Sequence, residues 1–180
     1  MPAAPLAVAL PSLRSGREIT LLAEQESRES GYGFLDAEHL LVAAVVLCSG
    51  IPRLREVLVA HGVTPAAVRP AVSAFVGAGA GAGMRAGAGT GAGAGPGAAD
   101  PEQREPVACS PAAARVLARA AQLVGPGDRL RPDHVLLAVL DGVDDPLMGS
   151  AHDVLETVGV DVRRLRQALR RAGRRLGPVA

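Results

Sequence analysis

Two well-separated stretches of the sequence place a carboxylate directly before a histidine. They are Glu38-His39 and Asp133-His134, and an apolar run follows each pair. Carboxylates accept charge-assisted hydrogen bonds, and histidines exchange protons or bind metals near neutral pH. The pairs lack the His-x-x-x-His spacing that places two metal ligands on one helix face, and the two other histidines belong to other segments. No metal site is therefore expected, and the carboxylates remain the candidate binding groups.

Nucleophilic chemistry would have to use one of two cysteines, Cys48 or Cys109. Cys48 lies at the end of an apolar run, which is typical of a small buried residue. The sequence contains no Gly-x-Ser-x-Gly elbow, and because it contains no lysine it also lacks a phosphate-binding P-loop. Nothing demands catalysis, an ATPase module or a cofactor, so an enzyme is not expected. If the protein is an enzyme, the alternative is a thiol hydrolase that uses Cys48 or Cys109.

Both carboxylate–histidine pairs also have the features of a helix start. Asp36 can act as an N-cap, because its side chain can accept a hydrogen bond from a free backbone N–H of the first turn. Pro132 suits the first helical position, where a missing N–H is harmless. Glu38 and Asp133 then lie where the helix dipole favours negative charge. A purely structural role for both pairs is the simpler alternative to binding.

A longer repeat surrounds the two pairs. Residues 54–63 follow the first pair and residues 151–160 follow the second, and both segments end in Gly-Val. Gly62 and Gly159 fit the position after a helix, where a left-handed backbone is needed. A further amphipathic segment follows each copy. The chain therefore contains two copies of one multi-helix unit.

With these residues the sequence resembles the double Clp repeat found at the N-terminus of ClpA- and ClpC-type protein unfoldases. The first copy matches at residues 24–32 and 36–41, and the second at 110–117 and 133–137. The resemblance covers roughly residues 12–76 and 110–173. It implies an all-α fold of two four-helix repeats related by pseudo-twofold symmetry. It also implies a non-catalytic domain that binds substrates and adaptor proteins for an unfoldase ring.

The resemblance also indicates which residues would bind. ClpC-type repeats can hold phosphoarginine with the motif glutamate and a threonine near the start of the repeat. By position, the glutamates become Glu38 and Asp133, and the threonine becomes Ser110 in the second repeat. In the first repeat it falls near Leu13, beside Ser12. The resemblance thus gives a substrate- or adaptor-binding set, which is Glu38, His39, Ser12, Ser110, Asp133 and His134.

Periodicity and capping residues divide the chain into a tail, two units and a linker. The tail covers residues 1–11, and the repeats cover 12–76 and 110–175. Residues 77–109 are rich in Gly and Ala and are expected to form a flexible linker. The helices are expected near residues 12–30, 36–47, 53–60, 65–76, 110–124, 132–140, 147–158 and 161–173, with no sheet.

The last helix is strongly basic. Val162, Leu165 and Leu169 give it an apolar stripe, whereas its other positions carry arginines. A solvated basic face is the simple interpretation. The functional alternative is an assembly protein that docks acidic partners through this helix. Binding of RNA is less favoured, because stacking aromatics are absent.

Net charge and the length of the apolar runs further limit the kinds of partner that we expect. The formal net charge is +1, which argues against general binding of nucleic acids. No apolar run reaches the roughly 20 residues that span a bilayer, and no secretory signal is recognisable, so a cytoplasmic protein with free thiols is expected. We therefore expect partners among a ClpC-type unfoldase, its adaptors and its substrates, with a role as adaptor or competitor in regulated proteolysis.

Overall fold

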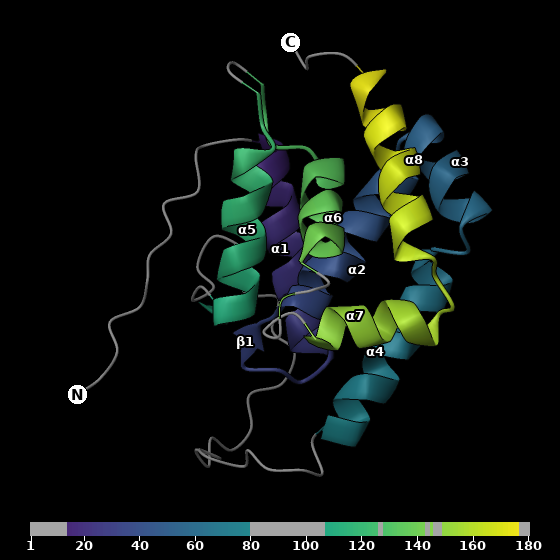
Figure 1. The fold of residues 1–180 in the computed structure, drawn as a ribbon. Coiled ribbons are helices and arrows are strands. Elements are labelled where there is room, and N and C mark those ends of the chain that lie inside the picture. The colour runs from purple at the N-terminus through teal and green to yellow at the C-terminus, as the bar shows by residue number, and fades with distance from the viewer. Residues whose placement is uncertain (1–13, 80–106, 126–127, 143–144, 146–148, 177–180) are drawn as a thin grey trace, which may run out of the picture.

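The computed structural model describes residues 14–79, 107–125, 128–142, 145 and 149–176. This part of the chain is mostly helical, as expected (Figure 1). The tail at residues 1–11 lies outside the described residues, as do Ser12 and most of the linker predicted at 77–109.

Within the described residues, each half of the chain contributes four helices. The helices before the Gly/Ala-rich segment are α1 (Arg14–Glu29), α2 (Ala37–Ser49), α3 (Pro52–Ala60) and α4 (Pro65–Gly79). Those after it are α5 (Pro111–Gln122), α6 (Pro132–Asp141), α7 (Gly149–Thr157) and α8 (Val162–Arg174). Prolines at the first helical position and serine or aspartate caps explain several of these starts.

The expectation of no sheet was wrong in one detail. Strand β1 (Phe34–Leu35) pairs in parallel with strand β2 (Ala108–Cys109), and Phe34 faces Ala108 in the register. Ser110 extends the contact, because its N–H donates to the Leu35 carbonyl at 2.8 Å. The end of the predicted linker, at residues 107–109, is therefore part of the folded body. This pairing places the start of α5 directly beside the start of α2.

The core is centred on two helices, α2 and α6, that pack against each other. Every residue from Ala37 to Val45 is buried, and so is every residue from Asp133 to Leu140. Helices buried on all sides require partners around them, because they expose no polar face to water. Here α1, α3, α4 and α7 also cover α2, whereas α5 and α8 cover α6.

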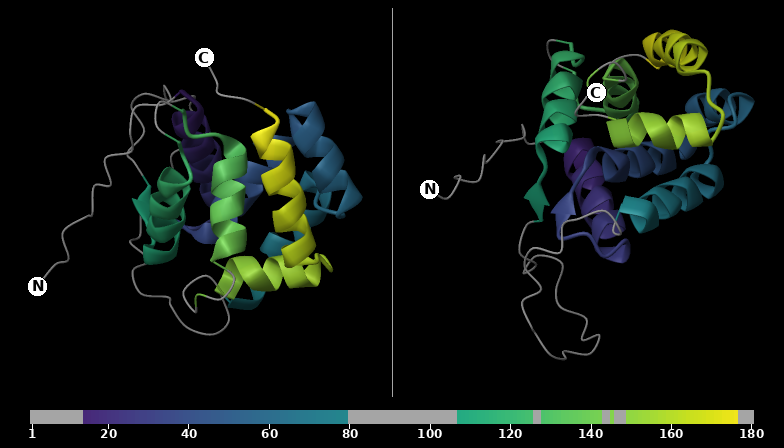
Figure 2. Two further views of the ribbon diagram at one scale, coloured as in Figure 1. Left: turned by 45° about the horizontal axis from the view of Figure 1, so that its top comes forward. Right: turned by 60° about the horizontal axis from the view of Figure 1, so that its bottom comes forward.

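The outer helices of one half contact those of the other half. Helix α3 packs against α8, and α4 packs against α7, although each pair is far apart in sequence (Figures 1 and 2). Glycines with left-handed φ angles, 72° at Gly62 and 77° at Gly159, end the helices that precede α4 and α8. These two glycines confirm the expected chain reversals.

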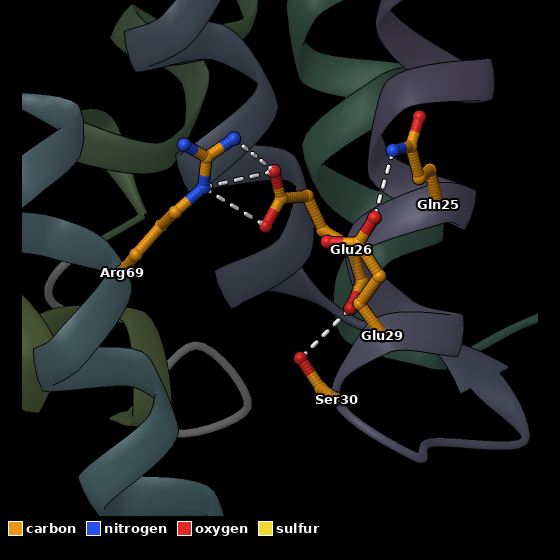
Figure 3. A network of polar contacts seen from close by, with 5 residues as sticks. All are labelled: Gln25, Glu26, Glu29, Ser30 and Arg69. Carbon is orange, nitrogen blue, oxygen red and sulfur yellow. Dashed lines mark hydrogen bonds and ion pairs between the residues drawn. The ribbon is translucent and has the colours of Figure 1, made fainter.

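An ion pair joins the first and last helices of the first half. The Arg69 guanidinium of α4 donates to both Glu26 carboxylate oxygens of α1, with its shortest contact at 2.6 Å (Figure 3). Bidentate pairs of this kind fix orientation as well as distance. Because the Arg69 side chain is about half exposed, we assign the pair a positioning role rather than a large contribution to stability.

Candidate functional site

The first carboxylate–histidine pair begins α2, as the sequence predicts. The Asp36 carboxylate accepts the Ala37 N–H at 2.8 Å, which confirms the N-cap. The backbone N–H of Asp36 in turn donates to Nδ1 of His39 at 3.0 Å. A histidine here takes the place of the Glu or Gln that completes a capping box. His39 thus contributes to the helix start, through a hydrogen bond that the sequence analysis did not predict.

The second pair repeats half of this arrangement at the start of α6. Nδ1 of His134 accepts the backbone N–H of Arg131 at 3.3 Å. Arg131 has no side-chain acceptor, so the N-cap bond that Asp36 makes has no counterpart here. Two helices that pack at the centre of the protein therefore begin with a histidine in the same capping position.

Burial favours the neutral form of both histidines. Desolvation is the main cause that lowers the pKa of His39 and of His134, and the charge of Asp36 or Asp133 opposes it. Because Nδ1 accepts a hydrogen bond, the neutral ring carries its proton on Nε2. His39 is fully buried, and its Nε2 has no partner among the described residues. The edge of the Tyr32 ring packs against this imidazole, with centroids 5.3 Å apart.

Glu38 points into the junction between the two halves. Glu38 is 5% exposed, and its carboxylate accepts a hydrogen bond from the Ser150 hydroxyl of α7 at 2.9 Å. Burial is the main cause that raises the pKa of this carboxyl, and the nearby charge of Asp36 adds to it. We expected a free carboxylate at this position, whereas the structure places it in an internal hydrogen bond. A ligand would have to displace Ser150 to reach it.

Asp133 is occupied by a side chain of its own unit. The Arg131 guanidinium donates to both carboxylate oxygens at 2.9 Å, and the Asp133 side chain is only 1% exposed. Arg131 also donates to the Gly173 carbonyl at 3.3 Å, near the end of α8. A Cβ at Gly173 would lie 2.7 Å from an Asp133 oxygen, so this close approach requires glycine. The second motif therefore fixes α8 against α6.

Ser110 does not join Asp133, although their positions in one repeat suggested it. It caps α5 by accepting the Ala113 N–H at 3.0 Å, and its hydroxyl donates to the Asp36 carboxylate at 2.7 Å. Parallel pairing of β1 with β2 brings these two helix starts together. Ser110 thus belongs with the first motif, in the other half of the chain.

One hollow, lined by both charged and apolar residues, opens beside the second motif. It has a volume of about 390 Å³, and its lining includes Arg131, Asp133 and His134 from α6 and the turn before it. Arg170 and Arg174 of α8 line its other side. Both signs of charge meet here, but the Asp133 carboxylate is already paired with Arg131. Of the predicted set, only Asp133 and His134 lie together at this hollow.

The two cysteines lie in different environments. Cys48 is fully buried in α2, and desolvation raises its pKa well above the ordinary value of a thiol. Cys109 is exposed on β2, but its thiol is partly desolvated. This desolvation is the main cause that raises the pKa of Cys109, and the charge of Asp36 adds to it. Reactive cysteines depend on the thiolate, which a raised pKa disfavours.

Three residues that shape the site went unrecognised in the sequence. Arg131, Ser150 and Gly173 complete the contacts of the motif carboxylates, yet none lies within the matched residues 36–41 and 133–137. The closeness of Arg131 to Asp133 in the chain was the only signal available. Ser150 and Gly173 are brought in by tertiary packing alone.

The comparisons with known proteins leave the family open. No protein-family model matches the chain, and a search of the curated proteins finds no significant relative. No described helix is both long and apolar enough to cross a membrane. Within the same described residues, no group of three histidine, cysteine or acidic side chains is placed to hold a metal ion.

Proposed function

We propose that this chain is a Clp N-domain-like protein that binds other proteins without catalysing a reaction. Its partners would be a ClpC-type unfoldase, its adaptors or its substrates, in the cytoplasm. It would present substrates for regulated proteolysis or compete with the N-domain of the unfoldase. The observation that carries the proposal is the matched pair of central helices, α2 and α6, each started by a histidine that accepts the N-cap N–H.

The helix contacts support the two-repeat arrangement that the proposal needs. If a pseudo-twofold axis relates the two halves, α3 is equivalent to α7 and α4 is equivalent to α8. The contact between α3 and α8 then becomes the contact between α7 and α4, and both contacts are present. The contact between α2 and α6 maps onto itself. We propose, on this pattern, that the fold consists of two pseudo-symmetric four-helix repeats.

We do not extend the proposal to phosphoarginine at the second motif. The Arg131 guanidinium already pairs with Asp133 in the way that the guanidinium of such a ligand would. At the first motif, a donor stronger than the Ser150 hydroxyl can compete for Glu38. Contacts of a carboxylate with charged donors contribute about 1.5–3 kcal/mol, more than neutral ones.

The alternative of a thiol hydrolase receives less support. Raised pKa values for Cys48 and Cys109 lower the fraction of reactive thiolate at neutral pH. Replacement of both cysteines by serine should leave the biological activity unchanged under our proposal. Loss of activity in that variant would favour the hydrolase.

Binding to a purified ClpC-type unfoldase and its adaptors tests the proposal. Titration of the full chain should show a saturable complex, and degradation of an unfoldase substrate should become faster for an adaptor or slower for a competitor. Glu38→Ala should weaken a complex that uses this carboxylate about ten- to hundredfold. Ser150→Ala is the matched control, because it frees the same carboxylate and should preserve or increase the affinity.

Two results would contradict the proposal. One is the absence of any complex with the unfoldase, its adaptors or its substrates. The other is a complex whose affinity is unchanged by Glu38→Ala and Asp133→Ala, with melting temperatures lowered in both variants. That second result would assign the two motifs a purely structural role.

A further inference from the structure

Helix α8 and the residue after it concentrate the positive charge of the protein. Residues 162–175 contain seven arginines and no carboxylate, out of a total of nineteen basic residues. The net charge of the whole chain is +1, so the remainder of the chain carries a net charge of −6 (1 − 7). The seven are Arg163, Arg164, Arg166, Arg170, Arg171, Arg174 and Arg175.

The packing of α8 does not depend on the four arginines at positions 163, 171, 174 and 175. Leu165, Leu169 and Gly173 face inward and are buried, and they fasten α8 to its neighbours. Arginines three or four residues apart on one helix repel each other, which weakens the helix. Neutral polar residues at the four exposed positions 163, 171, 174 and 175 would leave the packing unchanged and reduce this repulsion. The charge therefore calls for another explanation.

The inner edge of α8 shows what these guanidiniums bind. Asp141 of α6, whose side chain is 5% exposed, accepts hydrogen bonds from Arg166 at 3.2 Å and from Arg170 at 2.9 Å. Arg119 of α5 approaches the same carboxylate at 3.6 Å. Arg164 pairs with Asp161 at 3.2 Å. In the described chain, every ion pair made by an arginine of α8 is thus with a carboxylate.

The outer edge has no such partner. Among the described residues, no carboxylate lies within ion-pair distance of Arg163, Arg171, Arg174 or Arg175, and all four are exposed. Arg53 of α3 adds a fifth cation to this edge, because its guanidinium donates to the Arg175 carbonyl at 3.4 Å. Figures 1 and 2 show α8 at the surface, beside α3.

We propose that this outer edge of α8 docks an acidic segment of a partner protein through guanidinium–carboxylate pairs. Arginine suits this task because its planar fork matches a carboxylate in a bidentate manner. Nucleic acid fits less well. The net charge of −6 on the rest of the chain repels a long polyanion, and α8 and α3 contain no aromatic residue on which bases would stack.

The docking proposal is independent of the Clp-type function, because it rests on α8 alone. Its test uses the full-length protein and a short fluorescein-labelled peptide rich in glutamate, with fluorescence anisotropy as the readout. A single-stranded RNA of the same net charge is the competing probe. Arg171→Gln/Arg175→Gln removes two outer-edge charges. Arg17→Gln/Arg129→Gln is the matched control, since both residues are exposed and lie outside α8, on α1 and in the loop before α6.

We expect the outer-edge variant to bind the peptide about tenfold more weakly and with a smaller dependence on salt. The control variant should bind within about twofold of the wild-type protein. Circular dichroism should show equal helicity in all three proteins. Equal losses in both variants, or no binding of the peptide by the wild-type protein, would overturn the proposal. Tighter binding of the RNA than of the peptide would assign the edge to nucleic acid instead.

Discussion

Asp133→Asn is the most informative single change, because it alters charge with little change in volume. Asp133 lies in the first turn of α6, almost completely buried, under the guanidinium of Arg131. The amide of Asn can accept only one of the two hydrogen bonds that the carboxylate accepts. Its NH₂ group would also face the Arg131 guanidinium, which has only donors.

The expected loss of stability follows from the burial of the pair. Breaking a buried ion pair by removing one partner costs about 3–5 kcal/mol. The Arg131 side chain is 13% exposed and retains the Gly173 carbonyl as an acceptor, so water and this bond relieve part of the loss. We therefore expect about 2–4 kcal/mol at this site. For a chain of this size, about 3 kcal/mol lowers the melting temperature by roughly 6–12 °C.

Urea and thermal unfolding, followed by far-ultraviolet circular dichroism, would measure the effect. A double-mutant cycle with Arg131→Met separates the pair from the other contacts of each residue. The double variant should lose less than the sum of the single variants, with a coupling of about 1–3 kcal/mol. Asp161→Asn is a suitable control, because its pair with Arg164 is exposed and should contribute less than about 1 kcal/mol.

Two outcomes would refute this reasoning. A loss below about 1 kcal/mol for Asp133→Asn would mean that the pair contributes no more than an ordinary surface pair. Strict additivity in the cycle would mean that the two side chains do not depend on each other. Either result would reopen Asp133 as a group available to a ligand.

Three further predictions concern the same helix starts. Gly173→Ala should destabilise the protein although alanine is the better helix former, because the new Cβ would lie 2.7 Å from an Asp133 oxygen. In an Asp133→Ala background, urea unfolding should show that Gly173→Ala lowers the free energy of unfolding much less. Stability should fall as the pH drops from about 6.5 through the lowered folded-state pKa values of His39 and His134, because the unfolded state binds protons more readily. His134→Gln keeps an acceptor for the N-cap N–H but does not titrate, so thermal melts should show a shallower loss; an unchanged pH profile would contradict the assignment. Ser110→Ala should cost about 1–2 kcal/mol in urea unfolding, because it removes the cap of α5 and the bond between the halves; a loss like that of an exposed serine would show that this contact is unimportant.

Local signals in the sequence predicted the helices well. The N-cap Asp36 and the helix-start prolines mark where elements begin, and the glycines at 62 and 159 mark where chain reversals occur. The apolar run after His39 fits a helix that is buried on all sides, as α2 is. These features act within one or two turns of the chain, so they can be read without knowing the tertiary structure.

The site was less accessible to sequence reasoning. The link from Ser110 to Asp36 depends on pairing of two-residue strands, which are too short to produce a periodic pattern. The contact of Glu38 with Ser150 joins residues 112 positions apart. A carboxylate at a helix start gives no indication of which distant side chain will donate a hydrogen bond to it.

The mutual burial of α2 and α6 has a consequence for how the protein folds. Neither half can cover its own central helix, because part of that cover is the central helix of the other half. The contacts of α3 with α8 and of α4 with α7 add to this interdependence. Loss of one half therefore exposes an apolar helix in the other. We expect the two halves to melt together in one cooperative transition, and two separately produced halves to become stably folded only when they are combined.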